Sequence, residues 1–237
     1  MRNSIEKLNF DFVEFLPFRE RPFRAKFIPS KIWKDLDKYK NNSEGLSNYC
    51  KKWRTSVKLY KRSRSKVFDE YIAVAGEYDM EDRRITAIIM DKSFDQFNFT
   101  KQSWARFKFK FIQMMMHELI HFMQFERRDG EFANYYLAYK KTGKLKRDQE
   151  RRYLSNFDEI QAYAHCIYLD LLYYHPNKSP ADLNFKKRSI SPTLSYYLRT
   201  FEKDPKNNAA LNKLLQQIVK WEKKYKKLKV RDGKHYR

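Results

Sequence analysis

The sequence is poor in the residues that interrupt helices, and it has little cysteine. Its 237 residues include five glycines and seven prolines, so we expect few tight turns and a body dominated by helices. The two cysteines, Cys50 and Cys166, stand far apart, and neither belongs to a Cys-x-x-Cys pair. This spacing excludes a zinc ribbon and a disulfide framework.

Long apolar runs are missing as well. No stretch of about eighteen apolar residues is present that could span a membrane. The segment Leu8–Phe15 alternates and carries acids, so it does not resemble an export signal. We therefore expect no membrane partner, and a protein that acts in a cytoplasm or in a viral particle produced in one.

Acidic residues are scarce relative to basic ones. Lysine and arginine number 51 against 29 acids, which gives a net charge of +22 and a field that favours polyanions. Basic clusters lie at 58–66, 140–147 and 220–229. They are open to three interpretations: contact with nucleic acid, selection of acidic protein substrates, or a solvated surface encoded by a Lys-rich, AT-biased gene. Sequence-specific recognition has no support, because no RRM, KH, zinc-finger or glycine-rich phosphate motif appears.

The most specific motif of the chain reads His-Glu-x-x-His, from His117 to His121. Residues four apart share one face of a helix, so the two imidazoles can bind one metal ion. Glu118 lies at the edge of that face, within reach of a metal-bound water. The flanking segments 111–116 and 122–125 are almost wholly apolar, which predicts a buried helix. Histidines and a carboxylate are costly there unless they are paired or bind a metal. We therefore predict that the motif binds Zn²⁺. The alternative is that the two histidines and an ordinary glutamate lie on a half-buried helix and bind no metal.

A catalytic zinc site needs a third protein ligand and one open position. Glu159 is the best candidate, because it lies in segment 155–164, where a polar start leads into an apolar helical stretch. Two alanines in that stretch would allow this second helix to approach the first one closely. Glu150 and Asp158 are the alternatives for the third ligand. Glu159 could equally be a solvated acid at the start of a helix.

The combination of His117-Glu118-x-x-His121 with Glu159-Ile160-Gln161-Ala162 resembles the zincin metallopeptidases of the gluzincin type. In those enzymes a glutamate on a following helix completes the metal site. The resemblance covers approximately residues 67–175. It implies a zinc-dependent peptidase that hydrolyses a protein or peptide substrate with a zinc-bound water, for which Glu118 is the general base and proton shuttle.

Two related arrangements have no support in the sequence. The His-x-x-Gly-x-x-His extension of the metzincins is absent after His121. No histidine follows within the next forty positions, which argues against Spartan-like proteases with a third histidine. The ligand set that the gluzincin resemblance implies is thus His117, His121 and Glu159.

Four further residues are candidates for the surroundings of the site. Tyr163 lies one helical turn beyond Glu159, so its phenol could stabilise an oxyanion or could simply belong to the core. His165 is either a partner of a metal ligand or an ordinary buried ring. Gln113 and Gln124 flank the histidines at helical spacing and are candidates to line the cleft.

Taken together, these patterns predict an α+β fold dominated by helices. A small, zincin-like β-sheet would pack on the His-Glu-x-x-His helix, and additional helices would follow at the C-terminal side. We expect a basic N-terminal arm and helices over 1–66, a zincin-like catalytic core over 67–180 and a helical extension over 181–237. These three parts would form one compact unit.

The individual elements are predicted from periodicity and caps. Residues 1–30 are expected to be an extended arm with a loop. One predicted helix begins at Pro29, and a second covers 43–61. A third extends from Thr100 or Ser103 to Arg128, before Gly130, and a fourth begins at Ser191-Pro192. A fifth covers 208–229 and has an apolar stripe at Leu211, Leu214, Leu215, Ile218 and Tyr225. The runs 71–75 and 85–90 predict a β-hairpin.

Two functions follow from the sequence. The first is a zinc metallopeptidase. The second is a basic nucleic-acid-associated or virion structural protein, whose zincin-like core would have little or no peptidase activity. The small size and the compositional bias suit a phage genome.

Overall fold

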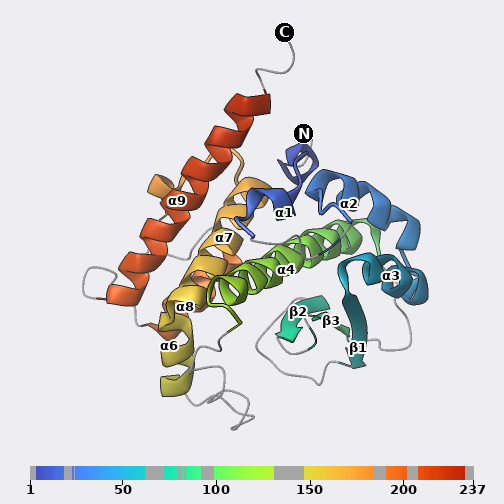
Figure 1. The fold of residues 1–237 in the computed structure, drawn as a ribbon, viewed down its shortest axis with the longest axis horizontal. Coiled ribbons are helices and arrows are strands. Elements are labelled where there is room, and N and C mark those ends of the chain that lie inside the picture. The colour runs from blue at the N-terminus through green and yellow to red at the C-terminus, as the bar shows by residue number, and fades with distance from the viewer. Residues whose placement is uncertain are drawn as a thin grey trace. The chain divides into compact units, whose positions relative to one another are not determined.

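A computed structural model describes residues 4–18, 23, 25–61, 72–79, 82, 84–91, 99–130, 147–183, 191–201 and 208–232. The fold is α+β and dominated by helices, as predicted (Figure 1). The chain divides into two compact units, residues 1–131 and 132–237. Most of the basic clusters predicted at 58–66 and 140–147 lies outside the described residues.

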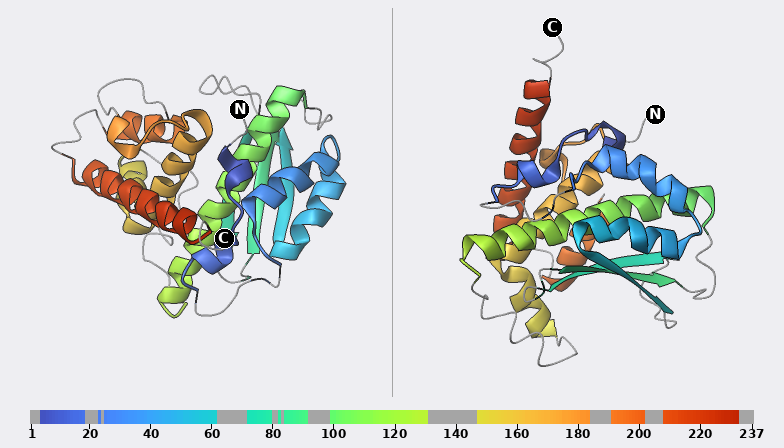
Figure 2. Two further views of the ribbon diagram at one scale, coloured as in Figure 1. Left: turned by 90° about the horizontal axis from the view of Figure 1, so that it is seen from above. Right: turned by 45° about the vertical axis from the view of Figure 1, so that its right-hand side comes forward.

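The first unit contains a three-stranded mixed sheet (Figure 2). Its strands are β1 (Thr55–Lys61), β2 (Ile72–Asp79) and β3 (Arg84–Asp91), in the order β1-β3-β2. Strands β2 and β3 pair antiparallel, as the predicted hairpin requires, whereas β1 pairs parallel with β3. Ile85 is therefore opposite Thr55 on one side and Tyr78 on the other.

One face of this sheet is covered by the long helix α4 (Lys101–Arg127), which packs on β2 and β3. Ile85, Ala87 and Ile89 alternate along β3, and all three are buried. Residues between them point to the other face, where the hydroxyls of Ser56 and Thr86 form an exposed hydrogen bond of 3.2 Å. This period of two gives the sheet one buried apolar face and one more exposed face.

Helix α4 agrees with its predicted limits. The Thr100 hydroxyl accepts a hydrogen bond from the backbone nitrogen of Ser103 at 3.2 Å and caps the first turn. After the helix the chain adopts positive φ at Asp129 (55°) and at Gly130 (83°). A glycine here costs no side-chain strain, so it ends the helix as a C-terminal stop signal.

The described part of residues 1–28 contains the short helical elements η1 (Ser4–Lys7) and α1 (Phe12–Phe15), whereas the sequence suggested an extended arm. Helix α2 (Pro29–Asp35) begins at Pro29, as predicted, and is followed by η2 (Leu36–Tyr39), α3 (Ser43–Cys50) and η3 (Lys51–Trp53). Asp11 fixes the start of α1, because its carboxylate accepts hydrogen bonds from the backbone nitrogens of Val13 and Phe27.

The predicted helix over 43–61 is wrong in its second half. Helix α3 ends at Cys50, and Arg54 then adopts the left-handed conformation with φ of 52° before β1 begins. The segment Thr55–Lys61 alternates polar and apolar residues, a pattern that suits a strand with one covered face. Pairing with β3 supplies the hydrogen bonds that a continued helix would have made internally.

The second unit is helical over its described residues. Its elements are α6 (Arg147–Ser155), α7 (Phe157–Tyr174), η4 (Pro180–Asp182), α8 (Pro192–Thr200) and α9 (Ala209–Asp232). Helix α8 begins at Pro192 as predicted, with the Ser191 hydroxyl accepting from the backbone nitrogen of Leu194. Helices α7 and α9 lie side by side (Figure 1). Of the predicted stripe of α9, Leu211, Leu214, Ile218 and Tyr225 are buried.

A membrane span needs about twenty predominantly apolar residues in succession. None of the helices within the described ranges is both long enough and apolar enough to cross a membrane.

Candidate metal centre

His117 and His121 lie one turn apart on α4, as the motif predicts. Their Nε2 atoms are 3.0 Å apart, and their rings meet at an interplanar angle of 81°. His121 is 5% exposed, whereas His117 is half-buried. Helix geometry alone brings the rings together, because side chains at i and i+4 project from the same face.

Gln124 determines how the His121 ring presents its nitrogens. The side-chain oxygen of Gln124 lies 2.8 Å from His121 Nδ1. A carboxamide oxygen is an acceptor, so Nδ1 donates the hydrogen bond, and the lone pair of the neutral ring is on Nε2. A partner of this kind, which fixes the tautomer of a histidine, is typical of metal ligands. The sequence placed Gln124 beside the histidines but did not predict this contact.

The spacing of the two nitrogens fits a zinc ion. Two nitrogens bound tetrahedrally at about 2.0–2.1 Å from zinc are about 3.3–3.4 Å apart. The observed 3.0 Å between the Nε2 atoms is within a few tenths of an ångström of that value. Small rotations of the two side chains are sufficient to accommodate the ion.

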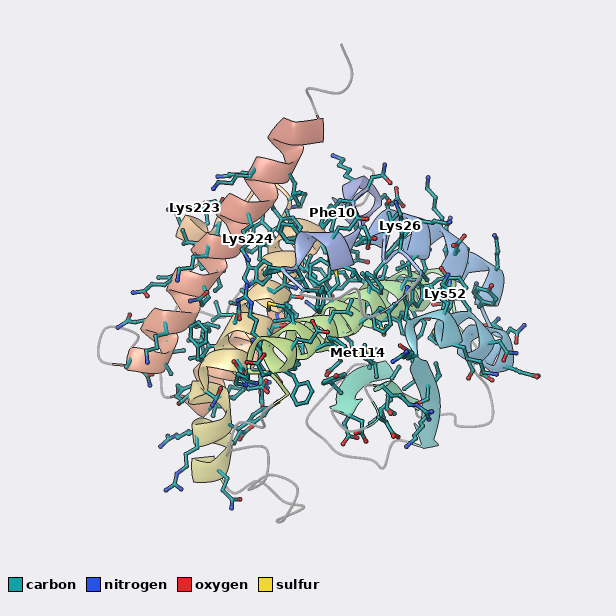
Figure 3. All side chains as sticks on the ribbon, in the orientation of Figure 1. Phe10, Lys26, Lys52, Met114, Lys223 and Lys224 are labelled. Atoms are coloured by element: carbon teal, nitrogen blue, oxygen red, sulfur yellow. The ribbon has the colours of Figure 1, made fainter. Side chains whose placement is uncertain are left out.

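Glu118 points toward strand β2, where Gly76 makes room for it. A Cβ atom built on Gly76 would lie 2.5 Å from Glu118 Oε1 and 2.7 Å from both Glu118 Cγ and Met114 Sδ. Met114, labelled in Figure 3, precedes Glu118 by one turn on α4. Glu118 is 5% exposed, so the carboxylate is held in the packing between the helix and the strand.

Gly76 is a site residue that was not predicted from the sequence. A glycine within a strand pattern often marks the close approach of another group to the backbone. Gly76 lies within β2 opposite Ala87 of β3. This local signal was available in the sequence, but it does not say which group approaches.

Glu159 lies in the first turn of α7 and is completely buried. Asn156 caps this helix by accepting from the backbone nitrogen of Asp158 at 2.9 Å. The partial positive charge at a helix N-terminus stabilises a carboxylate in the first turn. The cap and the two acids in the first turn of α7 account for the polar start seen in the sequence.

The three predicted ligands form a candidate group for a metal ion. One ligand atom from each of His117, His121 and Glu159 lies within 4.8 Å of the others, and this group could hold a metal ion. Among the described residues, no other group of three or more histidine, cysteine or acidic side chains has its ligand atoms this close together. The solvated alternative for Glu159 is excluded by its burial.

The two alternative third ligands are placed differently. Glu150 accepts a hydrogen bond of 2.6 Å from the Tyr196 hydroxyl. Asp158 is buried in the first turn of α7. Neither belongs to the group that could hold a metal ion among the described residues.

Gln113, a candidate to line the cleft, accepts a hydrogen bond from Lys110 Nζ at 3.1 Å.

Tyr163 is half-buried and belongs to an aromatic cluster of the second unit. Its ring packs edge-on against Tyr197, with centroids 5.4 Å apart, and lies 6.2 Å from the ring of Tyr196. These contacts explain why a tyrosine stands at this position of α7. A role for its hydroxyl at an oxyanion stays a prediction.

His165 is an internal packing residue of the second unit. Its Nε2 lies 2.8 Å from the Tyr225 hydroxyl, and its ring packs against Trp221 at 4.6 Å between centroids. The ring is completely buried. Burial, together with the charge of Lys224, lowers the pKa of His165 to about 3. His165 is therefore an ordinary buried ring, which was one of the two expectations for it.

We predict that His165 makes the stability of the protein depend on pH. Because its pKa is about 3 when folded and about 6.5 when unfolded, the unfolded chain binds the extra proton between these values. Stability is therefore complete above about pH 6.5, and it falls as the pH is lowered toward 3, by up to about 1.4 kcal/mol per pH unit. Urea unfolding at pH 7.0, 6.0 and 5.0 measures this loss. A His165→Gln variant should lose less stability than the wild type over that range, and an equal loss would contradict the prediction.

Comparison with protein-family models, with curated proteins and with solved structures finds no match for this chain. The chemistry of the centre therefore rests on its own residues. They are two imidazoles with facing Nε2 atoms, a buried glutamate and a second carboxylate adjacent to the pair.

Proposed function

We propose that the protein is a zinc-dependent metallopeptidase in which His117, His121 and Glu159 hold the metal. The observation that carries the proposal is the buried group of these three side chains, in which Gln124 orients His121 Nε2 toward His117. Two nitrogens and one carboxylate are the ligand set of many catalytic zinc sites, which keep a fourth position open. The resemblance of the motifs to the gluzincins supports the same assignment.

Bound zinc would supply Lewis acidity, which lowers the pKa of water and polarises a peptide carbonyl. The protein contributes the remaining chemistry through Glu118. Its carboxylate accepts the proton of the attacking water and then donates it to the leaving amine. This task requires a carboxylate adjacent to the histidines but not bound to the metal, and the motif gives Glu118 that position.

Glu118 is also oriented for this task by its packing. The carboxylate lies against the backbone of β2 at Gly76 and beside Met114, so its rotamer is restricted by neighbours on two elements. A general base must be within hydrogen-bond reach of the proton that it abstracts. Restricting the side chain in advance lowers the entropy that would otherwise be lost when the substrate binds.

The metal content of purified protein tests the proposed ligand set. We expect one zinc per wild-type chain by elemental analysis after removal of loosely bound ions, and a markedly lower content in Glu159→Ala. Glu150→Ala is the matched control, because it removes a glutamate of the same unit that bonds to Tyr196; its zinc content should equal that of the wild type.

Two outcomes of this experiment would contradict the proposal. If the wild type contains no stoichiometric metal, the motif serves only helix packing. If Glu159→Ala binds as much zinc as the wild type, Glu159 is not a ligand.

A further inference from the structure

Helix α9 carries five exposed lysines on one side, at Lys213, Lys220, Lys223, Lys224 and Lys227. We call this set the lysine stripe. At about 100° per residue, the five positions fall within an arc of about 100° around the helix. Figure 3 shows nitrogen-tipped side chains along α9, with Lys223 and Lys224 labelled.

The orientation of the lysine stripe is fixed by the opposite side of the helix. Leu214, Ile218 and Trp221 are buried, and α9 packs against α7. The indole nitrogen of Trp221 donates to the backbone oxygen of Gln161 at 2.9 Å. Because these contacts prevent rotation of α9 about its axis, the lysines form a fixed surface.

Acids are excluded from the exposed side of α9. Its exposed residues, over the positions whose side chains are described, include no aspartate or glutamate. Glu222 is half-buried and forms an ion pair of 3.0 Å with Lys226, a lysine that lies outside the stripe. The positive charges of the stripe therefore add to one another.

The composition of the chain does not by itself account for the arrangement of lysines on α9. Lys31, Lys34 and Lys38 are also exposed and also recur at helical spacing. They are interspersed with acids: Asp35 lies 3.5 Å from Lys38, and Asp37 is exposed on the same segment. Lysines are abundant over the whole chain, but the exposed positions of α9 whose side chains are described combine them with no acid.

We propose that the lysine stripe binds the sugar–phosphate backbone of double-stranded nucleic acid without sequence preference. From Lys213 to Lys227 the helix rises about 21 Å, at about 1.5 Å per residue. A duplex presents about six phosphates per strand over that length, at about 3.4 Å each. The five lysines thus extend over the length of one row of about six phosphates and carry a charge of opposite sign and similar size.

The type of residue supports a duplex backbone over other nucleic-acid features. Lysine contacts phosphate as a point charge, and contacts with phosphate carry no sequence information directly. Single strands are bound largely by stacking on aromatic side chains, and the exposed positions of α9 whose side chains are described carry no aromatic residue. This proposal does not depend on the proposed peptidase activity.

The salt dependence of binding tests the proposal. The affinity for a 20-base-pair DNA duplex is measured by fluorescence anisotropy at several salt concentrations. The logarithm of the binding constant should fall with the logarithm of salt at a slope of about −4.5, at about −0.9 per lysine. Lys213→Gln/Lys220→Gln/Lys223→Gln/Lys227→Gln should reduce the magnitude of this slope by about 3.6. Lys224 is kept because it lies over the ring of Trp221.

A matched control separates the stripe from the total charge. Lys31→Gln/Lys34→Gln/Lys38→Gln/Lys51→Gln also removes four charges, so both variants change the net charge from +22 to +18. The control should retain the wild-type slope. Thermal unfolding followed by circular dichroism verifies that both variants are folded, since all eight positions are exposed.

Three outcomes would overturn the proposal. The first is no binding of the duplex by the wild type at low salt. The second is an equal loss in both variants, which would show that the total charge is responsible. The third is strong binding to vesicles that contain phosphatidylserine and are not displaced by the duplex. Duplex binding that persists in Glu118→Gln and after chelation of metal supports the stripe whether or not the protein is a peptidase.

Discussion

Glu118→Gln is expected to lower the rate of peptide hydrolysis by about 10²–10⁴-fold while leaving the zinc content unchanged. The amide has nearly the same shape as the carboxylate, so the contact with Gly76 is preserved. It cannot accept the proton of water, however, so the general base is lost. Because the residue is not one of the three proposed metal ligands, the metal should remain.

The experiment measures cleavage of a mixed peptide library by mass spectrometry together with elemental analysis. Glu126→Gln is the control, because Glu126 lies on the same helix two turns beyond Glu118 and has no role in the proposed mechanism. It should retain wild-type turnover. Undiminished cleavage by Glu118→Gln would refute the role of this residue, and loss of zinc would show that it helps to hold the metal.

Gly76→Ala is expected to lower the same activity by about 10²-fold, as a displacement of about 1 Å can do. The new methyl group would overlap Glu118 Oε1 at 2.5 Å and Met114 Sδ at 2.7 Å, so both side chains must move. We also expect a loss of stability of about 1–3 kcal/mol, the usual cost of overfilling a packed region.

Two comparisons distinguish this effect from a general destabilisation. Ala75→Ser adds one atom at the neighbouring position of β2, whose side chain points to the opposite face of the sheet, and it should retain activity. The second comparison is a double-mutant cycle. If Gly76 acts by positioning Glu118, adding Gly76→Ala to Glu118→Gln should cause little further loss of turnover. A full and additive loss would show that Gly76 affects the rate by another route.

Several parts of the structure follow from short segments of sequence. The limits of α4, its cap at Thr100 and its end before Gly130 follow from signals within one turn of each terminus. The facing nitrogens of His117 and His121 follow from helical periodicity alone. Burial of the apolar stripe of α9 was predicted for the same reason. In each case the interacting residues are within a few positions of one another.

The remaining features depend on contacts that form only in the folded protein. The segment after Cys50 is a strand because β3, thirty positions later, pairs with it in register; local periodicity predicted a longer helix. The contact of Glu118 with Gly76 joins residues more than forty positions apart. Likewise, the inclusion of Glu159 with the two histidines was expected from a resemblance, and its ligand atom is brought near theirs only by folding.

Local sequence patterns are therefore enough to predict which side chains could perform metal chemistry and on which helices they lie. Periodicity, caps and motif spacing are local, and they act before the chain is compact. The surroundings of those side chains arise only in the folded protein: the strand against which Glu118 packs, the burial of Glu159 and the fixed direction of the lysine stripe. These features depend on contacts between segments distant in sequence, whose free energy is gained only when the segments pack together.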